Sequence, residues 1–143
     1  MKKQHLYSIL FVLAFSFASH AQTALGKWKT IDDETKKPKS VVEIYESNGK
    51  IYGRVVEIFD KSKENKVCED CEGAKKGKPI KGMVLIEGLT KKGSNWEGGT
   101  ILDPNSGKVY KCTITLEGKD KLKVRGYVGI SLLGRTQYWE RVK

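Results

Sequence analysis

Hydrophobic and polar residues alternate along most of the chain with a period of two, beginning at Leu25. The alternating runs are short, and turn-forming residues separate them every eight to twelve positions. This spacing is typical of antiparallel sandwiches and barrels, because each run buries one face of a strand. It predicts strands at residues 25–31, 40–47, 50–59, 83–89, 95–103, 108–116, 121–128 and 134–142. We therefore expect a single all-β domain over residues 22–143.

The clearest hairpin turns at Asn48-Gly49, a dipeptide that tolerates the positive φ angles of a type I′ turn. A two-residue turn fixes the register of the two strands. The predicted pairs are Ser47 with Lys50, Tyr45 with Tyr52, Glu43 with Arg54, and Val41 with Val56. The aliphatic face of this hairpin is expected in the core. In the alternative arrangement Tyr45 and Tyr52 line the lumen of a small barrel, which makes them ligand-binding candidates.

Residues 60–82 form one unusually long connection, with seven lysines, five acidic residues and two of the three cysteines. Connections of this length in compact domains are usually either functional or mobile. The sequence leaves both interpretations open for this lysine-rich loop.

The two cysteines of the loop, Cys68 and Cys71, have the spacing of a redox dithiol or of half a zinc site. A zinc site needs four ligands, and Cys112 is the only other thiol. Glu69 and Asp70 oppose formation of a reactive thiolate. We therefore predict a structural Cys68–Cys71 disulfide, which an oxidising compartment favours. Cys112 alternates with apolar residues and is expected to be a buried free thiol.

The first residues have the pattern of a secretory signal. Lys2 and Lys3 precede an apolar run at residues 6–18, and Ser19-His20-Ala21 offers small residues at the cleavage position. A transmembrane anchor is the alternative, but a membrane-spanning helix needs about 20 apolar residues. We predict that residues 1–21 are a signal peptide cleaved before Gln22. The product is expected to be a soluble periplasmic or secreted protein with no membrane span.

Both histidines of the chain, His5 and His20, lie in the predicted signal peptide. The mature chain therefore lacks the side chain whose ordinary pKa suits proton exchange near neutral pH. This excludes catalysis by Ser-His-Asp or Cys-His groups, and it excludes histidine metal sites. We predict that the protein is not an enzyme and uses no cofactor.

The mature chain is basic. Removing Lys2 and Lys3 leaves 25 basic and 17 acidic residues, a net charge of +8. Such a charge favours solubility and suggests an anionic partner. Export makes nucleic acid an improbable partner, so an anionic envelope surface is the candidate.

Four segments resemble the bacterial secreted family known as domain of unknown function 2147. They are Gly26-Lys27-Trp28-Lys29-Thr30, Asn95-Trp96-Glu97-Gly98-Gly99, the stretch from Asp103-Pro104 to Gly107-Lys108-Val109-Tyr110, and the stretch from Leu122 to Thr136. The resemblance covers nearly the whole mature chain. It implies export and an approximate fold, and it implies no reaction, because the family has no established activity.

Gly26 and Trp28 also resemble the Gly-x-Trp start of the calycins, the lipocalin-like barrels. In those barrels an arginine from near the last strand covers the tryptophan, a role open here to Arg135 or Arg141. This resemblance implies a single antiparallel up-and-down barrel of about eight strands, with a β-sandwich as the alternative. Gly26, Trp28 and Trp96 are then structural residues.

The segment from Arg125 to Arg135 is a second candidate site. Ile130, Leu132 and Leu133 form an apolar stretch between the two arginines. Since a guanidinium grips a carboxylate or phosphate through two hydrogen bonds, the segment suits an amphiphile with an acidic head. In the alternative, Arg135 covers Trp28, Arg125 is solvated and the leucines are ordinary core.

Three functions follow. The first is a non-enzymatic envelope protein that binds a small apolar or amphiphilic ligand or an anionic envelope component. The second is a hydrolase that uses carboxylates, for instance Glu43 with Glu57 or Glu97. The third is an interaction or assembly protein that acts through its basic surface; its oligomeric state is open.

Overall fold

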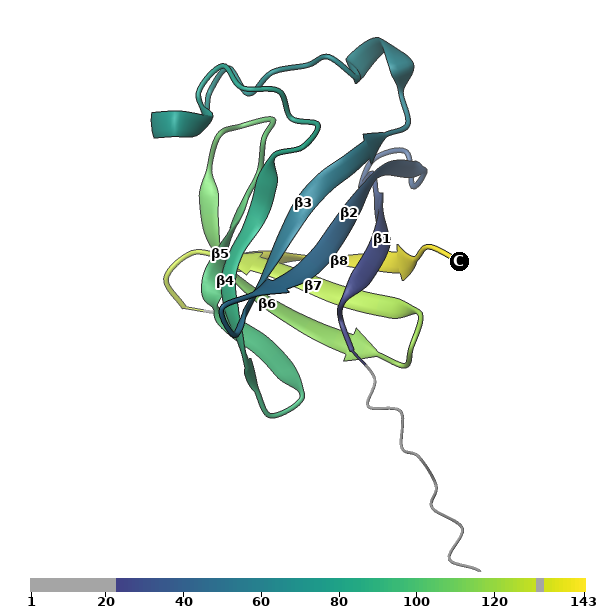
Figure 1. Cartoon of the computed structure of the whole chain (residues 1–143), viewed down its shortest axis with the longest axis vertical. Coiled ribbons are helices and arrows are strands. Elements are labelled where there is room, and N and C mark those ends of the chain that lie inside the picture. The colour runs from purple at the N-terminus through teal and green to yellow at the C-terminus, as the bar shows by residue number, and fades with distance from the viewer. Residues whose placement is uncertain (1–22, 131–132) are drawn as a thin grey trace, which may run out of the picture.

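Eight strands follow one another around a closed antiparallel barrel in a computed structural model that describes residues 23–130 and 133–143 (Figure 1). The strands are β1 (Gly26–Ile31), β2 (Pro38–Ser47), β3 (Lys50–Ile58), β4 (Val84–Lys92), β5 (Asn95–Leu102), β6 (Val109–Glu117), β7 (Lys121–Tyr127) and β8 (Gly134–Arg141). The barrel closes because β8 pairs with β1, with Trp28 opposite Arg141. The predicted up-and-down barrel is confirmed, and the sandwich is excluded.

The predicted signal peptide lies outside the described residues and stays a prediction. Within residues 23–130 and 133–143, no helix has both the length and the apolar character needed to cross a membrane.

The β2–β3 hairpin shows how local sequence sets the barrel wall. Asn48 and Gly49 have φ angles of 52° and 77°, as the type I′ turn requires. The predicted pairs nearest the turn are confirmed: Ser47 with Lys50, Tyr45 with Tyr52 and Glu43 with Arg54. The predicted Val41–Val56 pair is wrong. The register shifts between Val41 and Val42 because β3 has one extra residue there, Val56, so Val41 lies opposite Glu57 instead.

Side chains fill the interior of the barrel. The largest fully buried ones come from five strands, and they are Trp28, Ile44, Ile86, Leu89, Ile114 and Leu122. They belong to one continuous hydrophobic cluster. The strands also come close together: a Cβ on Gly53 would lie 3.1 Å from Val42 and 3.2 Å from Ile86. Space at the barrel centre is therefore occupied by protein.

The long connection between β3 and β4 has regular structure of its own. Two short 3-10 helices, Lys61–Lys63 and Gly73–Lys75, flank the cysteines, and an antiparallel bridge joins Val67 to Pro79. The predicted Cys68–Cys71 disulfide is confirmed, and both cysteines are buried. The loop sits against the β5–β6 turn, where a Cβ on Gly107 would collide with the backbone of Asp70.

The topology gives the barrel two distinct ends. The connections β1–β2, β3–β4, β5–β6 and β7–β8 lie at one end, which we call the long-loop end. The connections β2–β3, β4–β5 and β6–β7 lie at the other, together with the start of β1 and the end of β8. We call this the Arg141 end, and the candidate site is located there.

Candidate functional site

A clamp built by Arg141 closes one side of the Arg141 end. Its guanidinium carbon lies 4.2 Å from the centre of the Trp28 ring. Its Nη1 donates to the carbonyl of Leu25 at 2.9 Å, its Nη2 to that of Thr23 at 2.7 Å, and its Nε to that of Lys119 at 2.6 Å. The clamp therefore holds the segment before β1 against the barrel.

Trp28 is fully buried and supports the same segment from inside. Its indole Nε1 donates to the carbonyl of Ala24 at 2.8 Å. The structure thereby decides between the two arginines expected to cover Trp28. Arg141 has this role, and the alternative that gave it to Arg135 is wrong.

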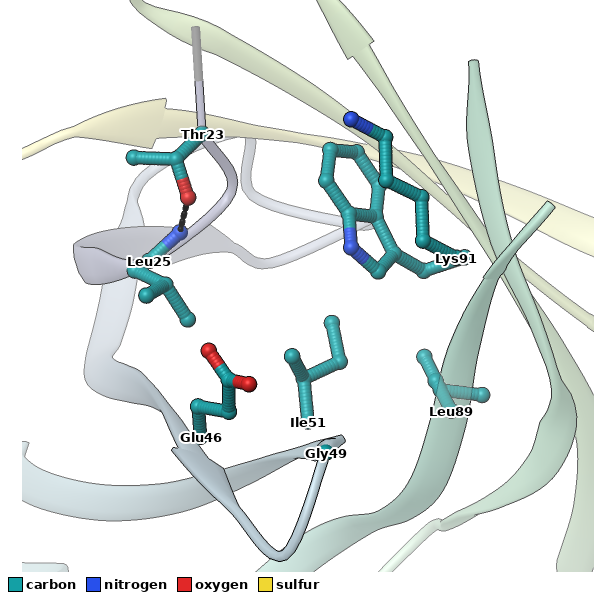
Figure 2. A pocket seen from close by; sticks show the side chains of 8 residues that line it. Thr23, Leu25, Glu46, Gly49, Ile51, Leu89 and Lys91 are labelled. Atoms are coloured by element: carbon teal, nitrogen blue, oxygen red, sulfur yellow. Dashed lines mark hydrogen bonds between the residues drawn. The ribbon is translucent and has the colours of Figure 1, made fainter. Parts of the chain in front are cut away.

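A hollow of about 290 Å³ opens beside the clamped segment. Figure 2 shows the residues that line it: Thr23, Leu25, Glu46, Gly49, Ile51, Leu89, Lys91 and Trp96. Ile51, Leu89 and Trp96 are buried and give the hollow an apolar floor. The hollow thus lies where three parts of the chain meet: the segment before β1, the β2–β3 hairpin and the β4–β5 hairpin.

Two opposite charges lie at the rim of this hollow. The carboxylate of Glu46 and the ammonium of Lys91 lie on different sides of it, with Leu25 and Ile51 nearby (Figure 2). The Lys91 Nζ is 5.7 Å from the centre of the Trp96 ring. Glu46 pairs with Ile51, and Lys91 pairs with Trp96. Both charges therefore continue rows of inward-facing side chains to the end of the barrel.

The chemistry of the site is that of binding. An apolar floor with one cation and one anion at its rim can hold a small molecule that has an apolar body and a polar head. In the described residues no group of three or more His, Cys, Asp or Glu side chains is placed to hold a metal ion. Glu43, a candidate catalytic carboxylate, is instead engaged by Arg54 on the outer surface, with Arg54 Nε 3.0 Å from Glu43 Oε1.

Tyr45 and Tyr52 do not reach the hollow. They stack on each other with ring centres 5.8 Å apart, and the Arg54 guanidinium lies 4.6 Å from the Tyr45 ring. Their neighbours Ile44 and Ile51 point inward and are buried. The alternative in which the tyrosines line the interior is therefore wrong.

The structure does not bring Arg125 and Arg135 together around an apolar wall. Arg125 lies opposite Thr136 and donates to its hydroxyl at 2.9 Å, whereas Arg135 lies opposite Gly126 and forms an ion pair with Asp33. Positions adjacent along a strand face opposite sides of the sheet, so the two guanidinium groups diverge.

The apolar residues between those arginines also lie away from the hollow. Ile130 is exposed at the long-loop end, and Leu132 lies outside the described residues.

Sequence reasoning missed Glu46, Lys91 and Leu89 as residues of the site, and it gave Trp96 only a structural role. The predicted strand over 83–89 ended too early, because β4 continues to Lys92. Glu46 already lay in the predicted strand at 40–47, in phase with buried Ile44, so the sequence could have placed it at the end of an inward-facing row. Lys91 could not be placed in this way, because buried Ile86 and Leu89 are three positions apart and the alternation breaks between them. The closeness of the two hairpins depends on the pairing of β3 with β4 across the long connection, which no local pattern contains.

Comparisons with known proteins agree with this fold. A solved structure described as "Protein HP1028 from the human pathogen Helicobacter pylori belongs to the lipocalin family" is similar, with a TM-score of 0.76 and 23% sequence identity. The match covers 85% of this chain and 84% of that one. No curated protein matches the chain. Residues 26–141, which include all eight strands, match a family model described as an uncharacterized protein conserved in bacteria. The chain, a lipocalin-like barrel, therefore belongs to this bacterial family, DUF2147.

Proposed function

We propose that this protein is an exported, non-enzymatic binding protein that holds a small apolar or amphiphilic molecule in the hollow at the Arg141 end. The observation that carries the proposal is the position of buried Ile51, Leu89 and Trp96 at the floor of an open hollow. Leu25, which is only half-buried beside this floor, gains free energy when the apolar body of a ligand removes it from water.

The size of the hollow limits the ligand. Ligand sites in proteins are commonly about 300–1,000 Å³, and this one measures about 290 Å³. It suits one short chain or one ring rather than a long lipid. Since the interior behind it is filled by Trp28 and its neighbours, the ligand rests at the barrel end and does not enter the barrel.

The rim charges favour an amphiphile with an acidic head. Lys91 is exposed and extends beside Trp96, so its ammonium can meet a carboxylate while the apolar body packs on the indole ring. Glu46, on another side of the hollow, disfavours an acidic group near Leu25 and fixes the orientation of the ligand. A zwitterionic ligand uses both charges.

The alternative hydrolase has less support. Glu43 is held by Arg54, and Glu97 lies 3.5 Å from the Lys92 ammonium on the rim of the β4–β5 hairpin. Neither carboxylate lines the hollow.

Titration with a fluorescent fatty-acid analogue of short chain length tests the proposal. Lys91→Gln should weaken probe binding about tenfold, since a charge-assisted hydrogen bond is lost. Lys92→Gln is the matched control, because Lys92 is the next residue and its side chain is 80% exposed toward Glu97. It should bind the probe as the wild type does. Failure of the wild type to bind, or equal loss in both variants, would overturn the proposal.

A further inference from the structure

A group of apolar side chains is exposed at the long-loop end, away from the hollow. The β7–β8 connection carries Val128, Ile130 and Leu133, which are 59%, 63% and 67% exposed, and Val109 at the start of β6 is 59% exposed. We call these four residues the apolar tip. Lys111 pairs with Tyr127 at the end of β7, so Val109 lies beside the root of the connection.

The backbone of the connection presents these side chains outward. The Val128 amide donates to the Leu133 carbonyl at 2.9 Å, and the Leu133 amide donates to the Ile130 carbonyl at 3.1 Å. Val128 and Leu133 therefore stand side by side at the root of the connection, and Ile130 lies close to Leu133. In Figure 1 the coloured part of this connection projects beyond the barrel wall, to the left of the strands. Because these exposed side chains project outward, they suit insertion into lipid better than capture of a ligand.

The barrel wall next to the apolar tip is cationic. Lys111, Lys123 and Arg125 alternate with buried residues of β6 and β7 and so lie on the outer face. No acidic residue occurs in 109–116 or in 121–127. Tyr138, 47% exposed, lies opposite Lys123 on the same face. On the other flank Asp33 neutralises Arg135. The positive potential is therefore concentrated on the β6–β7 side of the tip.

We propose that the apolar tip docks this protein onto an anionic lipid bilayer. Val128, Ile130 and Leu133 enter the boundary between headgroups and acyl chains, while Lys111 and Arg125 contact lipid phosphates and Lys123, further along β7, adds to the positive potential. Aliphatic residues flanked by Lys, Arg and Tyr are the combination that favours the membrane interface. The four aliphatic side chains of the apolar tip are too few for a stable protein interface, which buries about 800 Å² on each partner.

This docking goes beyond ligand binding and does not depend on it. The apolar tip belongs to the long-loop end, whereas the hollow belongs to the Arg141 end. A barrel held by its tip therefore keeps the hollow open to the aqueous phase.

Sedimentation with lipid vesicles tests the proposal. The purified protein should bind vesicles of phosphatidylethanolamine and phosphatidylglycerol. It should bind vesicles of phosphatidylcholine alone much more weakly. Ile130→Asn combined with Leu133→Asn should weaken binding at least tenfold. Val142→Asn is the matched control, because Val142 is also an exposed aliphatic residue but lies at the Arg141 end. It should leave binding unchanged.

A second pair of variants tests the charge contribution. Lys111→Gln combined with Lys123→Gln should weaken binding and reduce its salt dependence, whereas Lys92→Gln at the Arg141 end should do neither. Melting temperatures show whether each variant is folded. Absence of binding to anionic vesicles, or equal binding by folded wild type and tip variant, overturns the proposal. Self-association of the wild type that the tip variant abolishes, without vesicle binding, assigns the tip to a contact between copies and also overturns it.

Discussion

The guanidinium of Arg141 packs on the ring of Trp28, with its central carbon 4.2 Å from the ring centre. The two residues lie opposite each other at the point where the last strand closes on the first. Arg141 also donates hydrogen bonds to the carbonyl groups of Thr23, Leu25 and Lys119. One side chain thus joins the segment before β1, the first strand and the β6–β7 turn.

Replacing Arg141 by lysine should lower the free energy of unfolding by about 1–3 kcal/mol. Lysine keeps the positive charge but lacks the planar guanidinium, which donates to three carbonyl groups and covers the Trp28 ring. Urea unfolding followed by fluorescence measures the change. Arg135→Lys is the control: its ion pair with Asp33 is exposed and should be worth less than about 1 kcal/mol. Equal losses in the two variants would contradict the special role of Arg141.

Replacing Trp28 by alanine should cost about 3–5 kcal/mol, as truncation of a large buried aromatic side chain does. The side chain is fully buried, and its loss also leaves the Ala24 carbonyl without its donor. Thermal melting gives the measurement, and Tyr138→Ala provides a control at an exposed aromatic residue. A Trp28→Ala melting temperature within a degree or two of the wild type would contradict the structural assignment.

The features that the sequence predicted correctly are those that depend on residues close together in the chain. The turn at Asn48-Gly49 fixes the neighbouring pairs, because two residues with positive φ leave one register. The prediction failed at Val41, since no local signal marks the bulge between Val41 and Val42. The pairing of β8 with β1, which closes the barrel, is likewise not indicated by any local sequence pattern. Arg135 and Arg141 both lie in β8, and only the register of β8 against β1 selects Arg141.

The candidate site could be predicted only in part for the same reason. Trp96 was recognised as important from its motif, but its role at the floor of a hollow requires two hairpins that meet in space. Glu46 and Lys91 are ordinary surface residues of separate strands in the sequence. They become a pair of rim charges only when β3 pairs with both β2 and β4.

Cys112 should resist alkylation until the protein unfolds. Burial raises the pKa of its thiol to about 12, so almost none of the reactive thiolate exists at neutral pH. Without reductant, iodoacetamide should label Cys112 alone, and only in denaturant, because Cys68 and Cys71 are joined. Peptide mass mapping identifies the labelled residue. Rapid labelling of Cys112 in the native protein would contradict its burial.

The same thiol should make stability depend on alkaline pH. The pKa of Cys112 is raised from 9.0 to about 12 on folding, so the folded state retains a proton that the unfolded state releases. The contribution of the protonated Cys112 thiol to the free energy of unfolding is complete below pH 9, and it is lost as the pH rises toward 12. The stability of Cys112→Ala should therefore fall less steeply than that of the wild type over this range. Urea unfolding across the range measures both slopes, and parallel slopes would contradict the assignment.

The disulfide should control the long loop more than the barrel. Cys68 and Cys71 are buried where the loop meets the β5–β6 turn, and the bridge from Val67 to Pro79 starts next to them. Opening the disulfide leaves two buried polar thiols in place of one apolar link, which should loosen this contact.

Trypsin provides the measurement, since residues 60–82 contain seven lysines. Cleavage there should become about tenfold faster when Cys68 and Cys71 are both replaced by serine, because local opening of the loop limits access to its lysines. The barrel should stay folded, with the two fragments held together by β3–β4 pairing and its far-ultraviolet spectrum unchanged. Cleavage after Lys92, whose side chain is 80% exposed at the Arg141 end, reports general susceptibility and should proceed at the same rate in both proteins. Equal cleavage of the loop in both proteins would show that the bridge and the 3-10 helices hold it without the disulfide.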